Sequence, residues 1–314
     1  MPVIAVAGGT GGIGRAIVEG ILAAGKHEVK ILSRQPNPEL EKSIGATILA
    51  VDYSNVEALT QVFEDHNVHT LISALTFRTQ GGVAPERELL LAADASKTTK
   101  RYVANNWGVP FKEGDELLMP PMAPKVEASR AVRQAKDLEY TNFYTGFFLD
   151  YWGIPAVKSY MKPAVMVLDI AHNAAAIPGS GDTHLAFTHT TDVGKYVAAA
   201  MDLDKWEPGY NLSADRITWN EFLALAEGVR GTKFNVAYDD LEKLKAGQVT
   251  ELPTQVNAGL FSSGDAYRKF MAFAYLAMAN GQFDFDEGKR ARDAFPEIEP
   301  KTVKSLLEEA WKSG

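Results

Sequence analysis

The sequence contains no cysteine, so it forms no disulfide and offers no thiolate as a nucleophile or metal ligand. It has no apolar run near the roughly 18 residues that a membrane-spanning helix needs. The net charge of −8 gives no reason to expect binding to nucleic acid or to an anionic membrane surface. The six histidines are scattered without a His-Glu-x-x-His pattern or another ligand spacing, so we expect no metal site.

The composition that remains is ordinary for a globular protein of 314 residues, with 46% hydrophobic and 23% charged residues. The first strand-like run begins at residue 3 and leaves no room for a signal peptide. We therefore expect a cytoplasmic protein whose partner is a small molecule, not a nucleic acid or a membrane.

Strand-like and helix-like segments alternate through the first half of the chain. The expected strands are 3–7, 27–34, 45–52, 69–75, 99–106 and 139–146. The expected helices are 12–24, 54–66, 85–96 and 123–136, the second with Ser54 and Glu57 at capping-box spacing. This alternation predicts an α/β fold, a Rossmann-type doubly wound parallel sheet with helices on both faces.

The second half is less regular. It contains a possible strand pair at 160–170, a strand running into a helix at 185–203, and helices at 217–231, near 258–280 and at 301–313. Thr218 and Glu221 again have capping-box spacing. We expect residues 1–150 to form a nucleotide-binding Rossmann core. Residues 151–314 would form a smaller α+β substrate-binding lobe packed on it, with some segments returning to the core.

A glycine cluster lies between the first strand and the first helix. Gly8, Gly11 and Gly14 follow at a spacing of three, with Gly9 and Gly12 between them. Glycine lets the backbone approach a phosphate closely, and the helix start directs N–H groups and a positive dipole end toward it. The cluster therefore favours a dinucleotide site over an ordinary tight turn. The predicted contacts are Gly8, Thr10, Gly11, Gly12, Ile13 and Gly14.

The end of the second strand indicates which dinucleotide binds. A carboxylate there would accept from a ribose 2′-hydroxyl and favour NAD, whereas this strand ends with Ser33 and Arg34. A guanidinium pairs with the 2′-phosphate of NADP, so we expect NADP(H), the alternative being a solvated Arg34. Asp52 and Tyr53 are placed to border the adenine, or Asp52 only supports a turn.

Two further strands end at the ligand crevice. Ser73, Ala74 and Leu75 end the fourth strand, and Asn105 ends the fifth. We predict that Ala74, Leu75 and Asn105 contact the cofactor. Arg78 follows the fourth strand and either meets an anionic ligand or lies in a solvated loop.

Five segments together resemble the NmrA-like and isoflavone-reductase-like proteins, atypical members of the short-chain dehydrogenase/reductase superfamily. They are GGTGGIGRAIVEGI at 8–21, the Ser33-Arg34 pair, YTGFFLDY at 144–151, FTHTTDVGKYVAAAM at 187–201 and GYNLSADRITWNEFLALAEGVRGTKF at 209–234. The resemblance covers most of the chain and implies a Rossmann core that binds NADPH, with a C-terminal lobe closing over a substrate cleft.

The resemblance also implies a functional lysine. In the family's reductases a lysine at the start of the helix after the fifth strand acts near the nicotinamide, and Lys125 occupies the matching place. No tyrosine here has lysine four residues later, so the Tyr-x-x-x-Lys pair of other relatives is missing. Lys125 would bind the ribose, polarise a carbonyl or move a proton; the alternative is a lysine that points into water.

The remaining site predictions concern the nicotinamide end. Tyr144, Thr145, Gly146 and Phe147 follow the sixth strand and should approach it. The candidate substrate-pocket residues are Arg78, Asn106, Trp107, Phe148, Trp152 and His172. Core packing is the alternative for the aromatic residues, and a structural role is the alternative for His172 and for His189.

One segment departs from the family. Residues 104–108 read Ala-Asn-Asn-Trp-Gly where a proline-serine-glutamate/glycine segment is expected, which indicates a different substrate or reaction. We expect an NADPH-dependent reductase of a small aromatic or polycyclic carbonyl, imine or enol-type metabolite. Two alternatives stay open: an NADP(H)-sensing regulatory protein with a protein partner, and an enzyme that keeps NADP bound for a non-redox rearrangement or isomerisation.

Overall fold

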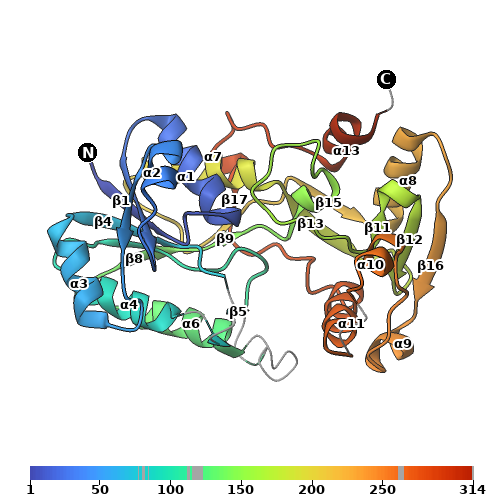
Figure 1. Cartoon of the computed structure of the whole chain (residues 1–314), viewed down its shortest axis with the longest axis horizontal. Coiled ribbons are helices and arrows are strands. Elements are labelled where there is room, and N and C mark those ends of the chain that lie inside the picture. The colour runs from blue at the N-terminus through green and yellow to red at the C-terminus, as the bar shows by residue number, and fades with distance from the viewer. Residues whose placement is uncertain are drawn as a thin grey trace. The chain divides into compact units, whose positions relative to one another are not determined.

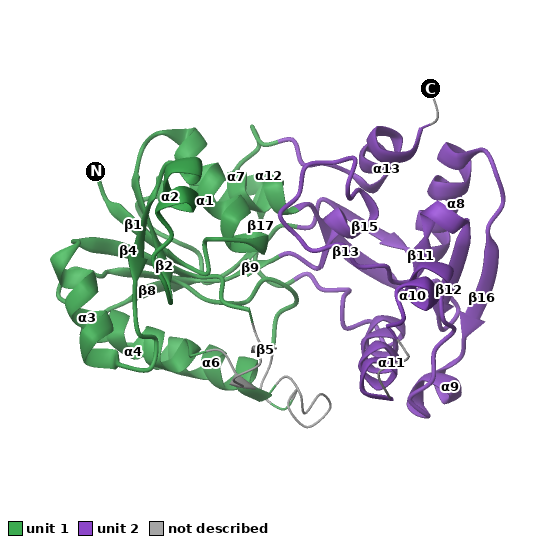
Figure 2. Cartoon of the chain, in the orientation of Figure 1, with its two compact units in different colours: residues 1–144, 190–212, 287–298 green, residues 145–189, 213–286, 299–314 purple. Residues whose placement is uncertain are grey.

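The structure is a computed structural model that describes residues 1–76, 78–79, 82–83, 85–111, 114, 123–260 and 265–312. It forms two compact units, shown in green and purple in Figure 2. Unit 1 comprises Met1–Tyr144, Thr190–Leu212 and Glu287–Ile298. Unit 2 comprises Thr145–His189, Ser213–Asp286 and Glu299–Gly314.

A parallel sheet of six strands forms the centre of unit 1 (Figure 1). Its strands are β1 (Val3–Ala7), β2 (Glu28–Ser33), β3 (Thr47–Ala50), β4 (Val68–Ser73), β7 (Arg101–Val103) and β8 (Glu139–Thr141). They lie in the order β3-β2-β1-β4-β7-β8, the strand order of a Rossmann fold. All five residues of β1 are buried, as expected for a strand covered on both faces. The predicted fold class is confirmed.

Helices cover both faces of this sheet. They are α1 (Gly12–Ala24), α2 (Pro38–Ile44), α3 (Val56–Asp65), α4 (Glu86–Ala95), α6 (Ala123–Gln134) and α7 (Thr190–Met201). The short helix α12 (Ala291–Ala294) also belongs to unit 1. In Figure 1, α1 and α7 lie on one face and α3, α4 and α6 on the other. The strand ends are aligned by register: Ala7 pairs with Leu32 and with Ser73, so β1, β2 and β4 end at one edge.

Short strands complete unit 1. The strands β9 (Phe143–Tyr144), β14 (Tyr210–Asn211) and β17 (Lys289–Arg290) form a small sheet, and β5 (Arg78–Thr79) pairs with β6 (Gly82–Val83). The expected sixth strand is therefore divided, because Asn142 separates β8 from β9 and the chain pairs with β14 from there on.

Unit 2 contains two three-stranded sheets. Their strands are β10 (Phe147–Phe148), β13 (His184–Thr188) and β15 (Asp215–Thr218), and β11 (Leu168–Asp169), β12 (Ala174–Pro178) and β16 (Asn235–Asp239). Its helices are α8 (Trp219–Arg230), α9 (Leu241–Lys245), α10 (Pro253–Asn257), α11 (Asp265–Ala279) and α13 (Val303–Trp311), with 3-10 turns at Leu149–Trp152 and Ile170–His172.

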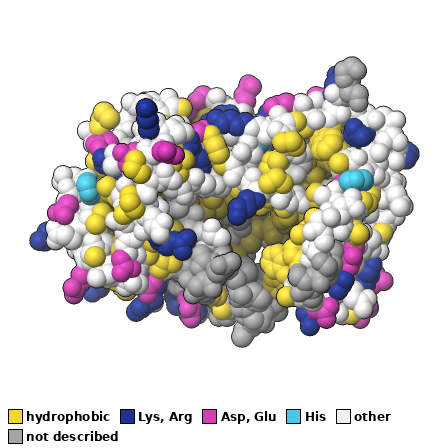
Figure 3. Space-filling view, viewed as in Figure 1, with side chains coloured by type: hydrophobic (Ala, Val, Ile, Leu, Met, Phe, Trp, Pro, Cys, Tyr) yellow, Lys and Arg dark blue, Asp and Glu magenta, His cyan; other side chains and the backbone are white. Residues whose placement is uncertain are grey.

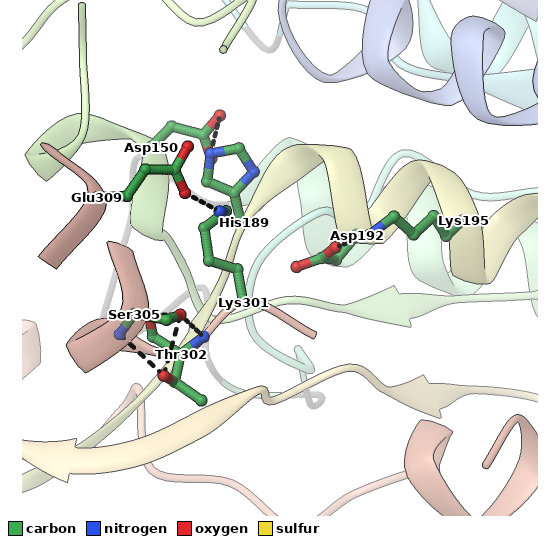
Figure 4. Close-up of polar contacts among 8 residues, drawn as sticks. All are labelled: Asp150, His189, Asp192, Lys195, Lys301, Thr302, Ser305 and Glu309. Atoms are coloured by element: carbon green, nitrogen blue, oxygen red, sulfur yellow. Dashed lines mark hydrogen bonds and ion pairs between the residues drawn. The ribbon is translucent and has the colours of Figure 1, made fainter. Parts of the chain in front are cut away.

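The caps of unit 2 follow from sequence. Thr218 and Glu221 form the predicted capping box of α8. Thr302 and Ser305 cap α13 reciprocally, next to an ion pair between Lys301 and Glu309 (Figure 4).

Two local predictions are wrong. The first is the cap at Ser54: α3 is capped by Asn55, whose Oδ1 accepts from the Ala58 N–H, while Ser54 donates to Asp52. The second is the strand pair at 160–170, where the structure has one short strand, β11. Val167, directly before it, has φ of 58°, which is incompatible with a continuous strand.

The surface carries acidic and basic side chains interspersed, as the face in Figure 3 shows for unit 1. In the described part of the chain, no helix combines the length and the apolarity needed to cross a bilayer.

Helices α1 and α7 pack closely against each other at Gly20 and Gly194. A Cβ on Gly20 would lie 2.3 Å from the Gly194 carbonyl oxygen, and a Cβ on Gly194 would lie 2.3 Å from that of Ala16. Real Cβ atoms do not approach this closely, so any larger residue would separate the helices. This contact holds segment 190–212, where the chain returns to unit 1, against α1.

We predict that Gly194→Ala lowers the free energy of unfolding by about 1–3 kcal/mol, because the added methyl group overlaps a backbone oxygen. The matched control is Gly228→Ala on the exposed face of α8, where a Cβ meets no atom within 4 Å. That change should raise the free energy of unfolding by about 0.5–1 kcal/mol. Urea unfolding followed by circular dichroism measures both; equal effects of the two substitutions would contradict the assignment.

Candidate functional site

The three spaced glycines of unit 1 have different surroundings. Gly8 has φ of 81°, and a Cβ on it would lie 2.5 Å from the Ala74 carbonyl oxygen. A Cβ on Gly14 would lie 2.3 Å from the Gly8 carbonyl oxygen, whereas a Cβ on Gly11 would meet nothing within 4 Å. Gly8 and Gly14 are therefore required by the protein's own packing, and Gly11 faces open space at the start of α1.

The N-terminus of α1 fits a phosphate group. No side chain caps it, and its first turn contains no acidic residue. The first N–H groups of a helix have no intrahelical partner, and the dipole adds positive potential there. Gly12, the first residue of α1, has φ of 52°, a conformation that glycine adopts without strain, and it directly follows Gly11. Thr10 is exposed and Ile13 is half-buried at the same turn.

The residues at the end of β2 are predicted to select NADP, and those after β3 to border the adenine. Arg34 is exposed and Ser33 half-buried at the end of β2. Tyr53 is buried, and its hydroxyl donates to the Leu32 carbonyl at 2.9 Å, which ties the end of β3 to β2. Asp52 is exposed, and hydrogen bonds from Ser54 lower the pKa of its carboxyl. The turn role for Asp52 thus has a structural basis, and Arg34 is accessible to a ligand.

A buried carboxylate lies where β4 and β7 end. Glu86 Oε2 accepts a hydrogen bond from Ser73 Oγ at 2.5 Å, and Oε1 accepts one from the Tyr102 hydroxyl at 2.6 Å. The Asn105 backbone N–H also donates to Oε1, at 3.3 Å. Burial raises the pKa of Glu86, and these hydrogen bonds together with the charge of Lys125 oppose that change.

Lys125 lies beside this network. Its Nζ donates to the Asn105 carbonyl at 3.3 Å and lies 5.9 Å from the centre of the Phe111 ring. Burial lowers the pKa of the Lys125 ammonium to about 8, and the Glu86 carboxylate opposes that change. The Lys125 side chain is half-buried and bonded to the backbone, so it does not extend freely into water; its role in a reaction stays a prediction.

The segment that departs from the family lies at the same place. The Asn105 side-chain amide donates to the Leu75 carbonyl at 2.9 Å, which links the ends of β7 and β4. The Trp107 indole N–H donates to the Ser73 carbonyl at 2.8 Å, and its ring stacks on Phe143. Asn106 is buried, and its Oδ1 has no hydrogen-bond partner among the described residues.

A pocket of about 220 Å³ lies in unit 1. It is lined in part by Asn106, Phe111, Arg133 and Tyr144, so it includes two of the predicted residues and adjoins Lys125 through Phe111. Its lining combines aromatic rings with amide and guanidinium groups.

The predicted residues that follow Tyr144 belong to unit 2. Thr145 is fully buried and accepts from Thr188 through its carbonyl oxygen. Gly146 has φ of 63°, and a Cβ on it would lie 2.1 Å from the Ala186 carbonyl oxygen, so this glycine is required by the packing of β10 on β13. Phe147 stacks on Phe283, with ring centres 4.1 Å apart, and Phe148 is half-buried.

Three other candidates, Trp152, His172 and His189, contact side chains of unit 2. Trp152 is 3% exposed and packs among Phe187, Trp219 and Phe222, in the aromatic core of the unit. His172 is exposed, and its Nδ1 lies 3.1 Å from Asp169 Oδ1. His189 is buried with its Nε2 3.6 Å from Asp150 Oδ1 (Figure 4). The backbone of Arg78 lies in β5, and its side chain is outside the described residues.

Sequence reasoning missed Glu86 and Tyr102. Glu86 lies in the first turn of a predicted helix, where glutamate is common because its charge is favoured there, so its residue type gives no signal of a buried role. Tyr102 lies in an apolar strand, where a tyrosine is expected in any core. The only sequence signal was Ser73, a hydroxyl at the end of a buried strand, which was noted without a role. Among the described residues, no group of three His, Asp or Glu side chains is arranged to hold a metal ion.

Comparison with known proteins relates the whole chain to one group. The sequence is 35% identical over 231 residues to oxidoreductase BOA1 of Botryotinia fuckeliana, covering 74% of this chain and 77% of that protein. It is 26% identical over 333 residues to phenylcoumaran benzylic ether reductase Betv6 of Betula pendula, covering 98% of this chain and 97% of that protein.

Solved structures share the fold. The leucoanthocyanidin reductase–NADPH complex from Vitis vinifera matches with a TM-score of 0.73 and 19% identity, covering 98% of both chains. The sequence profile of the NmrA-like family matches residues 2–305. The resemblance inferred from the five segments is confirmed, and the chain belongs to the NmrA-like family.

Proposed function

We propose that the protein is an NADPH-dependent reductase of a small aromatic or polycyclic metabolite that carries a carbonyl, imine or enol-type group. The observation that carries the proposal is the position of Lys125: its Nζ donates to the carbonyl of Asn105, just after β7, and burial lowers the pKa of the ammonium to about 8. The names of the relatives, an oxidoreductase and a benzylic ether reductase, support this class of reaction.

The cofactor site of the proposal lies in unit 1. The N–H groups at the start of α1 would hold the pyrophosphate next to Gly11, and the exposed Arg34 guanidinium would pair with the 2′-phosphate. Tyr53 fixes the end of β3 through Leu32 and so shapes the adenosine side. A Vitis vinifera reductase of the same fold is known as a complex with NADPH, which supports this choice of cofactor.

Lys125 has the properties of a proton donor. NADPH, when bound, supplies a hydride from nicotinamide C4, and the heteroatom of the reduced group then needs a proton. With a pKa of about 8, Lys125 is mainly protonated at pH 7 yet is a stronger acid than an ordinary lysine. The Asn105 carbonyl holds its Nζ, so the ammonium is oriented before substrate binds.

The substrate side of the proposal rests on aromatic surroundings. Phe111 and Tyr144 line the pocket next to Lys125, and Arg133 and Asn106 give it polar groups. Residues 151–314 would supply the substrate-binding lobe, except for the segments Thr190–Leu212 and Glu287–Ile298, which belong to unit 1, the proposed cofactor-binding part.

The first test is fluorescence titration of the purified protein with NADPH and NADH. Arg34→Ala should weaken NADPH binding about tenfold to a hundredfold and leave NADH binding unchanged, because only NADPH has the 2′-phosphate. Lys100→Ala, at the opposite end of the sheet, is the control. Equal loss of affinity for both cofactors would contradict the role of Arg34.

Turnover is tested with a panel of aromatic carbonyl and imine compounds. If the protein binds NADPH but consumes none with any compound of the panel, a sensor or a non-redox enzyme is favoured.

The glycine turn gives a second prediction. Gly11→Ala should weaken NADPH binding about tenfold or more, because the new methyl group enters the space where the phosphate would lie. Gly11 has φ of −163°, which any residue adopts, so the melting temperature should stay unchanged. Gly14→Ala, in contrast, should lower the melting temperature through contact with the Gly8 carbonyl. Thermal melts with and without NADPH separate the two effects, and unchanged NADPH affinity in Gly11→Ala would exclude a phosphate at this turn.

Lys125 gives a third prediction. Lys125→Met should lower kcat about 10²- to 10⁴-fold while NADPH binding is retained, because the proton donor is lost. In the parent protein kcat/KM should fall as pH rises through about 8, where the ammonium loses its proton. Lys136→Met, which changes an exposed lysine just after α6, serves as the control. Full activity in Lys125→Met, or activity that rises above pH 8, would contradict proton donation by Lys125.

A further inference from the structure

Glu86 is a buried carboxylate that the proposed reaction does not yet use. It is the first residue of α4, a position where glutamate ordinarily extends into water, yet it is only 8% exposed. Three donors surround it: the hydroxyls of Ser73 and Tyr102 and the backbone N–H of Asn105. All three donate hydrogen bonds to its oxygens, and these bonds favour the charged carboxylate against the effect of burial, which raises its pKa.

A carboxylate buried in this way needs a nearby cation. Burying an ionised group is costly unless it is both hydrogen-bonded and paired with an opposite charge. Glu86 and Lys125 are both bonded to the backbone of Asn105, and each charge favours the charged form of the other. Tyr102 is the other ionisable group bonded to Glu86. Its pKa is raised well above the ordinary value by burial and by Glu86, so it stays a neutral donor.

The backbone of Asn105 connects the two charged groups mechanically. Its N–H donates to Glu86 Oε1, and its carbonyl oxygen accepts from Lys125 Nζ. The Asn105 side chain is held in turn by the Leu75 carbonyl. Any movement of Glu86 would therefore move the acceptor that holds the Lys125 ammonium.

We propose that Glu86 is a positioning residue for Lys125: its carboxylate orients the Asn105 backbone and keeps the Lys125 ammonium charged until its proton is delivered. The role in turnover rests on the proposed reductase function. The charge coupling between Glu86 and Lys125 requires neither cofactor nor substrate. Experiments can therefore contradict the coupling and the reductase function separately.

The direct test is an NMR titration of Lys125 in the cofactor-free protein. Lysines are reductively methylated with ¹³C-formaldehyde, and the Lys125 signal is identified by its absence from Lys125→Arg. The parent protein should titrate near pH 8 at this signal. Glu86→Gln keeps an acceptor for Tyr102 and Asn105 but removes the charge, so the apparent pKa should fall by about one pH unit or more.

The control is Glu88→Gln, which removes a negative charge from the same first turn of α4. It should leave the Lys125 titration where it is in the parent protein. An unchanged titration in Glu86→Gln, or equal changes in both variants, would overturn the proposal.

The pH profile of turnover extends the test. In Glu86→Gln the alkaline fall of kcat/KM should begin at a pH lower by the same amount as the NMR titration, with NADPH affinity unchanged. If Glu86→Gln lowers the apparent pKa of Lys125 but the parent protein reduces no substrate, the charge coupling is supported and only the reductase function is contradicted. If the enzyme turns over substrate, and Glu86→Gln changes neither the pH profile of kcat/KM nor the titration of Lys125, the role of Glu86 is overturned.

A second pair of variants covers the case in which Glu86→Gln folds poorly. Lys125→Met leaves the Glu86 carboxylate buried without its cation, so it should lower the melting temperature. Adding Glu86→Gln to Lys125→Met should recover part of that loss, since no unpaired charge remains. A double variant that melts at or below Lys125→Met would overturn the coupling.

Discussion

The backbone contact between Gly8, Gly14 and the end of β4 is the constraint on which unit 1 depends. Gly14 packs against the Gly8 carbonyl, and Gly8 packs against that of Ala74, with no room for a side chain at either position. These contacts fix where α1 begins relative to β1 and β4. The open space at Gly11 and the polar groups at the end of β4 both follow from that placement, so the proposed cofactor and proton sites share one edge of the sheet.

Much of this arrangement could be predicted from the sequence because it is local or periodic. The alternation of strands and helices is dictated by apolar spacing, and the glycine cluster has a meaning because it lies between Ala7 and Gly12. The Thr218–Glu221 capping box was found by spacing alone. The cap of α3 shifted by one residue because Asn55 and Ser54 are both good caps and Asp52 binds the serine.

What could not be predicted depends on contacts between distant segments. Glu86 is far in sequence from Ser73, Tyr102 and Lys125, and nothing in its neighbours indicates that its side chain turns inward. Trp152 is a candidate pocket-wall residue from its sequence position, with core packing as the alternative. In the structure it packs in the core of unit 2, where three other aromatic residues contact it. Lys125 was predicted only through the family resemblance. The physical reason for its lowered pKa is burial, which outweighs the opposing charge of Glu86, and burial is visible only in three dimensions.

The division of the chain between the two units has a consequence for biosynthesis. The chain passes from one unit to the other after Tyr144, His189, Leu212, Asp286 and Ile298, so neither unit is a contiguous fragment. The strand β17, which pairs with β14 in unit 1, follows every strand of unit 2 in the chain. The strands of the six-stranded sheet all lie before residue 142, but unit 1 becomes complete only after Glu287–Ile298 has been synthesised, when most of unit 2 has already been made. Deletion of Glu287–Ile298 would therefore damage the unit that contains the first strand of the chain.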